Sequence, residues 1–216
     1  MREKKLIRAV STSVASALLL IAMLVGCNEN SVTKKPDVSS DSSQTETAME
    51  RKDGERFEAV IVIEGQEETV KYEHVKNDKI GFELDYEYES LNRITESDYE
   101  RFVSVYDYSK KPSNYLEIAY SSEKAEKTVK TAKSDLSKSY KTVTVESCEL
   151  EGAGQCQRIN VSDAKGSKTP KDSLQTVYII PLGDGCIVAA AHYTIESAEG
   201  FGARFSQIVN TLSIIK

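Results

Sequence analysis

Few residues of this chain have the types and the spacing that catalysis or metal binding requires. The 216 residues include two histidines, His74 and His192, and four cysteines. A zinc site would therefore need cysteine or carboxylate partners, and neither CxxC nor HExxH spacing occurs in the sequence. Cys186 and His192 share one expected strand, which holds them about 20 Å apart, whereas a nucleophile and its base must lie about 3 Å apart. We predict no catalytic residue, no metal site and no cofactor.

Carboxylates and tyrosines are the remaining groups that could act on a ligand. The chain has 34 Asp and Glu residues, so a hydrolase whose carboxylates meet only in the folded protein stays an alternative. The 11 tyrosines suggest a second option, because aromatic rings stack on saccharides. Strand alternation places Tyr86 with Tyr88, and Tyr106 with Tyr108, on common faces. Half-buried strand positions explain these tyrosines as well, since tyrosine has a high strand propensity, and we favour that interpretation.

Two of the cysteines flank an expected hairpin turn, ELEGAGQ, in which two glycines permit positive φ angles. A three-residue turn over 151–153 would oppose Cys148 and Cys156, with Cβ atoms about 4.5 to 5.5 Å apart. A two-residue turn would instead place the two thiols on opposite faces. We predict a disulfide between Cys148 and Cys156 with Cys186 reduced. The alternative is three reduced core cysteines.

The fourth cysteine, Cys27, follows an apolar run of about 12 residues, and four basic residues precede that run. This is the layout of a secretory signal peptide. As a helix the run would rise only about 18 Å, less than the roughly 30 Å of a hydrocarbon core. Residues Leu24-Val25-Gly26-Cys27 resemble the bacterial lipobox. The resemblance implies that residues 1–26 are removed and that a diacylglycerol on Cys27 anchors the chain to the extracytoplasmic face of a bacterial membrane.

The charge and composition of the processed chain limit its partners and divide it into parts. Loss of residues 1–26 removes four basic residues and one acidic residue, so the formal net charge of −6 becomes −9. An acidic protein is a poor partner for nucleic acid. Residues 28–56 contain no aromatic residue and few aliphatic ones, which is typical of a disordered tether. We therefore expect a signal peptide over 1–26, the lipidated cysteine and tether over 27–56, and one globular domain over 57–216.

The domain has the periodicities of a mixed fold. Alternating apolar residues predict strands at 57–63, 70–75, 82–88, 101–108, 115–121, 142–150, 155–162, 174–181 and 185–194. Apolar residues three and four apart predict helices from Ser122 to Tyr140 and over 197–213. The segment CIVAAAHYTI, residues 186–195, is apolar on both faces and should be a central strand covered on both sides. Because turns join most strands, we predict an α+β fold with a mainly antiparallel sheet flanked by helices.

The order of these elements over residues 79–216 is similar to the PsbP-like fold, an α/β/α sandwich built on an antiparallel sheet. Members of that superfamily mostly act as accessory or binding proteins, and the resemblance contributes no catalytic residue. The resemblance implies an accessory or binding role. Together with the lipobox, we expect a membrane-anchored binding or accessory module, with a cell-envelope protein or a saccharide as partner. The alternative is a cell-envelope hydrolase. The basic segment SDAKGSKTPKD, residues 162–172, is a candidate contact loop.

Overall fold

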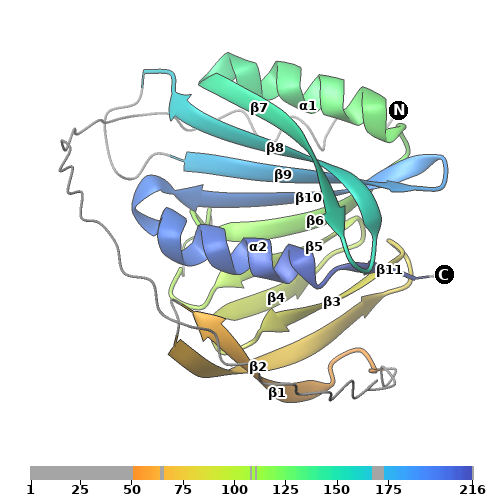
Figure 1. Cartoon of the computed structure of the whole chain (residues 1–216), viewed down its shortest axis with the longest axis vertical. Helices are drawn as coiled ribbons and strands as arrows, with labels where there is room; N and C mark the ends of the chain where they lie inside the picture. The colour runs from red at the N-terminus through yellow and green to blue at the C-terminus, as the bar shows by residue number, and fades with distance from the viewer. Residues whose placement is uncertain (1–50, 64–65, 108, 110, 167–172, 216) are drawn as a thin grey trace, which may run out of the picture.

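The computed structural model describes residues 51–63, 66–107, 109, 111–166 and 173–215, which form two antiparallel sheets and two α-helices (Figure 1). The strands are β1 (Arg56–Ile63), β2 (Gln66–Asn77), β3 (Phe82–Glu87), β4 (Leu91–Thr95), β5 (Tyr99–Ser104), β6 (Tyr115–Ser121), β7 (Tyr140–Leu150), β8 (Gly154–Ala164), β9 (Ser173–Leu182), β10 (Gly185–Thr194) and β11 (Ser213–Ile214). The helices are α1 (Ala125–Ser139) and α2 (Ala203–Asn210), and two short helical turns, η2 (Ile195–Ser197) and η3 (Ala198–Gly202), precede α2. Among the described residues, no helix is long and apolar enough to cross a membrane.

The larger sheet has seven strands in the order β4-β5-β6-β10-β9-β8-β7. Strand β10 is its middle strand and pairs with β6 on one side and β9 on the other. Ile187, Ala189 and Ala191 of β10 enter one hydrophobic core. Cys186 is buried in a second core on the opposite face. The prediction of a central strand covered on both sides is therefore confirmed, as is the antiparallel α+β class.

The two helices cover opposite faces of the seven-stranded sheet. Leu136 of α1 packs with Ile159 and Ile179 of β8 and β9. Phe205 of α2 lies in the other core, with Tyr178 and neighbouring residues of β9 and β10. Figure 1 shows α2 in front of the sheet and α1 along its upper edge. The sheet is thus the middle layer of a helix–sheet–helix arrangement, as expected.

The first strands form a separate sheet, which corrects the expectation of one sheet. Its order is β1-β2-β3-β11, and β11 pairs with β3 through Ser213 opposite Glu83. Val75, Phe82 and Leu84 of this sheet enter the same core as α2. Strands β1, β2 and β3 pair in sequence order, and the chain adds β11 to the free edge of β3 after α2. The two-residue strand β11 and the five-residue strand β4 were not predicted.

Helix α1 begins at Ala125, three residues after the expected cap at Ser122. The Ser121 hydroxyl accepts a hydrogen bond from the Glu123 backbone N–H at 3.2 Å. This contact accompanies a bend that precedes the helix, and Lys124 is the N-terminal cap, without a side-chain hydrogen bond. The expected cap is therefore wrong, although the apolar face of the helix is as predicted.

Helix α2 is shorter than the expected span of 197–213. Two glycines lie in the η3 turn, and glycine destabilises a helix by about 1 kcal/mol relative to alanine. At the other end, the Thr211 hydroxyl donates to the Ile208 carbonyl at 2.8 Å and accepts from the Asp85 backbone N–H at 2.9 Å. Thr211 therefore ends the helix and attaches it to β3.

The β7–β8 hairpin has the three-residue turn that opposes the two cysteines. Leu150 pairs with Gly154, and Cys148 pairs with Cys156. Gly154 has a φ angle of 76°, which favours glycine. Cys148 and Cys156 form a disulfide with a Cα–Cα distance of 5.1 Å, and Cys186 is reduced and buried. A Cβ added to Gly152 would lie 2.3 Å from the Cβ of Ser213, so glycine there permits the hairpin to contact β11.

Residues 51–55 contact the smaller sheet, although their composition suggested the tether. The Asp53 carboxylate accepts from the Lys76 backbone N–H at 2.9 Å. The Gly54 N–H donates to the His74 carbonyl at 2.8 Å, and Arg51 and Asp85 form an ion pair at 3.6 Å. These contacts place residues 51–56 with the folded part of the chain. The rest of the expected tether, the signal peptide and Cys27 lie outside the described residues.

Candidate functional site

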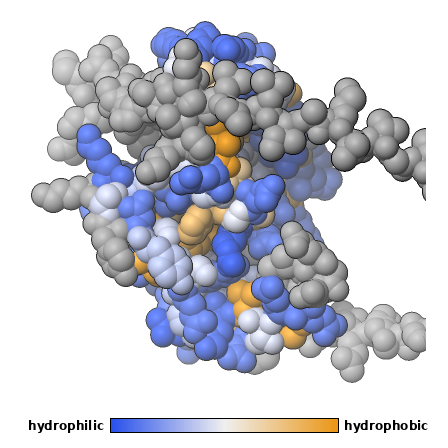
Figure 2. Space-filling view, turned by 90° about the vertical axis from the view of Figure 1, so that its left-hand side faces the viewer, coloured by the Kyte–Doolittle hydropathy of each residue, from blue (hydrophilic) through white to orange (hydrophobic). Residues whose placement is uncertain are grey.

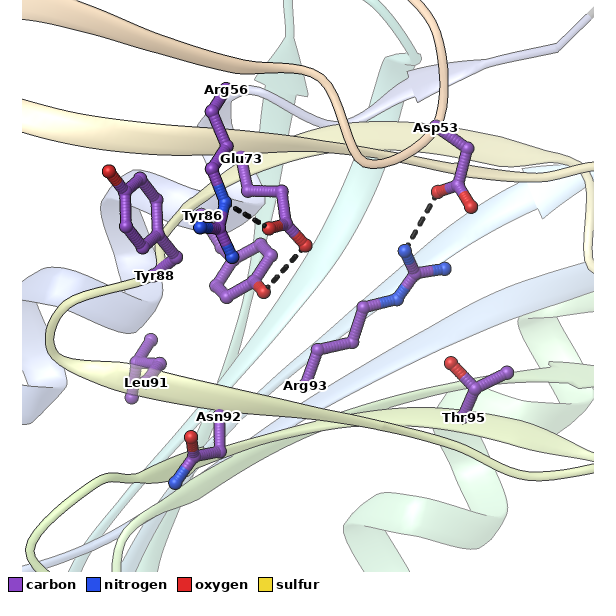
Figure 3. Close-up of a pocket in the computed structure, with 9 residues that line it drawn as sticks. All are labelled: Asp53, Arg56, Glu73, Tyr86, Tyr88, Leu91, Asn92, Arg93 and Thr95. Carbon is purple, nitrogen blue, oxygen red and sulfur yellow. Dashed lines mark hydrogen bonds and ion pairs between the residues drawn. The ribbon is translucent and has the colours of Figure 1, made fainter.

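An open groove of about 490 Å³ lies between the smaller sheet and β4 (Figure 3). Its lining residues are Asp53, Arg56, Glu73, Tyr86, Tyr88, Leu91, Asn92, Arg93 and Thr95. Most of these side chains are polar or charged. In Figure 3 the Arg93 side chain extends from β4 across the groove toward Asp53 on the opposite wall. The groove thus has one wall from each sheet.

The β4 wall is built on a buried ion pair. Arg93 Nη2 and Nε donate to the two oxygens of Glu100 at 3.0 and 3.2 Å, and Arg93 Nη1 donates to Asp53 at 2.7 Å. The Glu100 side chain is 1% exposed and also accepts from Asn77 Nδ2 at 2.9 Å and Thr95 Oγ1 at 2.8 Å. Burial opposes the charge on Arg93, but the hydrogen bonds to Glu100 and Asp53 raise the pKa of its guanidinium above the ordinary value. Arg93 is therefore fixed in one orientation.

The opposite wall presents a second arginine. Arg56 Nε donates to Glu73 Oε2 at 2.8 Å, and the Tyr86 hydroxyl donates to Glu73 Oε1 at 2.9 Å. The Arg56 guanidinium carbon lies 4.2 Å from the centroid of the Tyr88 ring, a cation–π contact. Burial and then the hydrogen bond to Glu73 raise the pKa of Tyr86. The Arg56 side chain is 62% exposed, so it can contact a ligand.

The two carboxylates that line the groove, Asp53 and Glu73, are each bound to a cation. Burial opposes the ionisation of Asp53, but hydrogen bonds from the Lys76 N–H and from Arg93 hold its pKa below the usual range. Glu73 accepts from Arg56. Each of these two carboxylates is therefore paired with an arginine of the groove.

His74 of β2 forms a buried pair with a carboxylate of β3, and neither of these residues lines the groove. Its Nδ1 lies 2.7 Å from Asp85 Oδ1, and its Nε2 lies 3.7 Å from Glu83 Oε2. Within the described residues, this buried Nε2 has no hydrogen-bond partner. The pair resembles part of a catalytic triad, but the Nε2 atom faces the Glu83 carboxylate and not a nucleophile. Nor do His, Cys, Asp and Glu side chains of the described segments form a group that could hold a metal ion.

His192 is a core histidine and does not lie in the groove. Its ring stacks on Tyr115, with 4.3 Å between the centroids and 12° between the planes. Burial, with a smaller contribution from the positive charge of Arg101, lowers the pKa of His192 to about 4. His192 and Cys186 lie on the same extended strand, and the Cys186 thiol instead contacts the Thr128 hydroxyl at 3.4 Å. No nucleophile and base are brought together on this strand.

The low pKa of His192 predicts a pH-dependent stability. The imidazole binds a proton near its ordinary pKa of about 6.5 in the unfolded chain, but only near pH 4 in the folded chain. The unfolded state therefore binds more protons in this window, and the free energy of unfolding falls as the pH falls, by up to about 3 kcal/mol. Urea unfolding at pH 7, 5.5 and 4.5 measures this slope. A His192→Gln variant should have a shallower slope, and an equally steep one would contradict the assignment.

The tyrosines that were considered as saccharide-binding candidates have different environments. Tyr86 and Tyr88 lie in the groove, although Tyr86 is buried and so agrees with the half-buried strand interpretation. Tyr106 is 79% exposed and does not line the groove. Tyr108 and most of the basic loop, residues 167–172, lie outside the described residues.

Neither of the two arginines of the groove was predicted as a site residue. Arg93 belongs to the β4–β5 hairpin, in which Arg93 pairs with Phe102. The turn residues ESD between two short alternating segments are the signal that could have predicted this hairpin. Arg56 precedes the first predicted strand by one residue and was assigned to the tether. Neither arginine carries a motif, because their roles depend on packing between two sheets.

Comparisons with known proteins find similarity among solved structures. No protein-family model matches the chain, and no curated protein matches its sequence. The solution structure of cyanobacterial PsbP (CyanoP) from Synechocystis sp. PCC 6803 is similar, with a TM-score of 0.46 and 9% sequence identity. The match covers 66% of this chain and 92% of that chain. The α+β class itself rests on the strands and helices described above.

Proposed function

We propose that this chain is a lipoprotein held on the extracytoplasmic face of a bacterial membrane through Cys27, and that its domain is a binding module. The groove between the two sheets is the proposed binding site, and its ligand is a polar, hydroxyl-rich molecule such as a saccharide of the cell envelope. The observation that carries the proposal is the fixed arrangement of two arginines and two carboxylates around an open groove.

The balance of charge in the groove favours a neutral ligand. Arg56 and Arg93 are matched by Asp53 and Glu73, each in a hydrogen-bonded pair. An anionic ligand would meet the two carboxylates, and a cationic ligand would meet the two guanidinium groups. A saccharide hydroxyl both donates and accepts, so it can donate to a carboxylate oxygen and accept from a guanidinium N–H. Both kinds of group on the walls therefore suit a polyhydroxy ligand.

The groove is also preorganised, which lowers the entropic cost of binding. The Arg93 guanidinium is held at three of its nitrogens, and its side chain is only 16% exposed. Arg56 is held between the Glu73 carboxylate and the Tyr88 ring. Side chains fixed in this way suit a specific binding site, because they need not be ordered when the ligand arrives.

Substitution of the exposed arginine is expected to weaken ligand binding. Arrays of envelope saccharides should give at least one ligand, and calorimetric titration with that saccharide should show at least tenfold weaker binding for Arg56→Ala, because loss of a charged hydrogen-bonding group costs about 1.5 to 3 kcal/mol. Tyr88→Ala should also weaken binding, since it removes the ring beneath Arg56.

Tyr106→Ala is the matched control, since it removes a tyrosine that is exposed and outside the groove. Its affinity should equal that of the unaltered protein. Binding that is unchanged by Arg56→Ala and Tyr88→Ala would contradict the groove as the site. Capture of an envelope protein through the groove, with no saccharide bound, would assign the site to a protein partner instead.

A further inference from the structure

Charge is distributed unevenly along the molecule. Residues 51–100, which include the smaller sheet, contain 15 acidic and 7 basic residues. Residues 122–141, which include α1, contain 3 acidic and 6 basic residues, and all six are lysines. Figure 1 shows α1 and the smaller sheet at opposite ends of the longest axis. An acidic chain therefore has one basic end.

The lysines of α1 face solvent. Lys127, Lys130 and Lys138 lie within an arc of about 80° around the helix axis, opposite the face that carries Leu136, and Lys133 flanks this arc. All four side chains are exposed. Lys127 pairs with Glu123 and Lys138 pairs with Asp135 on the helix surface, and exposed pairs of this kind hold their partners weakly. Among the described residues, no ion pair is formed by Lys130 or Lys133.

We propose that the lysine face of α1, defined as Lys127, Lys130, Lys133 and Lys138, docks on anionic lipid headgroups. The inference rests on the proposed lipid anchor, which keeps the domain beside a bilayer. Basic residues are attracted to an anionic leaflet within about one Debye length, roughly 8 Å at physiological ionic strength. The upper end of the molecule in Figure 2, at the level of α1, is hydrophilic, so the contact is electrostatic and does not require apolar insertion.

Docking through α1 orients the binding groove. Because the groove borders the smaller sheet, it would face away from the bilayer, and the acidic end would be repelled by the same lipids. The segment between Cys27 and Arg51 can extend to about 80 Å, whereas a folded chain of 160 residues has a radius of gyration of about 15 Å. The tether is therefore long enough to run from the bilayer past the folded domain to Arg51.

Vesicle binding without the anchor tests the docking surface. The mature chain, residues 27–216 with Cys27→Ser, is mixed with vesicles of phosphatidylglycerol or of phosphatidylcholine, and the partition coefficient is measured at low and at physiological salt. We expect stronger binding to phosphatidylglycerol, which added salt weakens. Replacement of all four face lysines by glutamine should lower this binding more than tenfold, because each lysine at such a surface contributes about fivefold.

A control variant carries the same change in charge at the acidic end, with Lys52, Lys71, Lys76 and Lys79 replaced by glutamine. Its partition coefficient on phosphatidylglycerol vesicles should be close to that of the unaltered chain. Equal binding to both lipids, or an equal loss in both variants, would overturn the proposal. Because this chain is not acylated, the result is independent of anchoring by Cys27. Saccharide titration in the absence of membranes tests the groove separately.

Discussion

An Arg93→Met variant is expected to lose about 3 to 5 kcal/mol of unfolding free energy, measured by urea denaturation at pH 7. The methionine side chain fills a similar volume but leaves the buried Glu100 carboxylate without its two guanidinium hydrogen bonds. Asn77 and Thr95 remain as donors, but they carry no charge to balance the carboxylate. An unpaired charge in a protein interior is among the few defects that destabilise a domain this strongly.

Two further variants separate the buried charge from the loss of arginine in general. Replacing both Arg93 and Glu100 by methionine should recover much of the stability, because no unpaired charge is then buried. Arg158→Met removes a surface arginine whose pair with Glu146 is partly exposed, and it should cost less than about 1 kcal/mol. If Arg93→Met were no more costly than Arg158→Met, the Arg93–Glu100 pair would not hold the β4 wall in place.

A Cys27→Ala variant should lose membrane attachment almost completely when it is expressed in a bacterium that acylates lipoproteins. In the proposed anchor the Cys27 thiol accepts the diacylglycerol, so alanine at this position could not be lipidated. Two long acyl chains give stable anchoring, since each buried methylene contributes about 0.8 kcal/mol. Fractionation after high-salt and carbonate washes, together with labelling by a radioactive fatty acid, measures the loss.

The stability of the folded domain supplies the control for this experiment. Cys27 precedes the first described residue, Arg51, by 24 positions, so we expect Cys27→Ala to leave urea unfolding unchanged. A variant that stays in the washed membrane fraction and still carries label would remove the basis for the proposed anchor. Retention without label would point to the apolar run of the expected signal peptide as the membrane attachment.

Local sequence patterns were sufficient to predict six of the seven strands of the larger sheet and the helix α1. Strand β10 was recognisable because both of its faces are apolar, and α1 because its apolar residues recur three and four apart. The first three strands of the smaller sheet were also predicted, but its fourth strand, β11, has only two residues and no periodicity of its own. The pairing of β11 with β3 depends on how α2 packs against the core. The residues that determine this packing are spread over the whole chain.

The groove could not be predicted for a related reason. Arg93 and Glu100 are seven residues apart in a strongly charged sequence, where such residues usually face solvent. Their burial arises from contact between two sheets, with Asn77 of β2 donating to Glu100 of β5. Only Tyr86 and Tyr88 among the groove residues were identified as ligand-binding candidates, because strand alternation placed them on one face.

The pairing of β3 with β11 also sets the order in which the molecule can be completed. Ser213 donates to Glu83 across a separation of 130 residues, so a chain synthesised from its N-terminus makes β3 long before its partner. At roughly 5 to 20 residues per second, this interval is about 10 s. The apolar side chains of β2 and β3 that contact α2 stay uncovered during that time. The wall of the groove that carries Glu73 and Tyr86 is therefore among the last parts of the protein to reach its final environment.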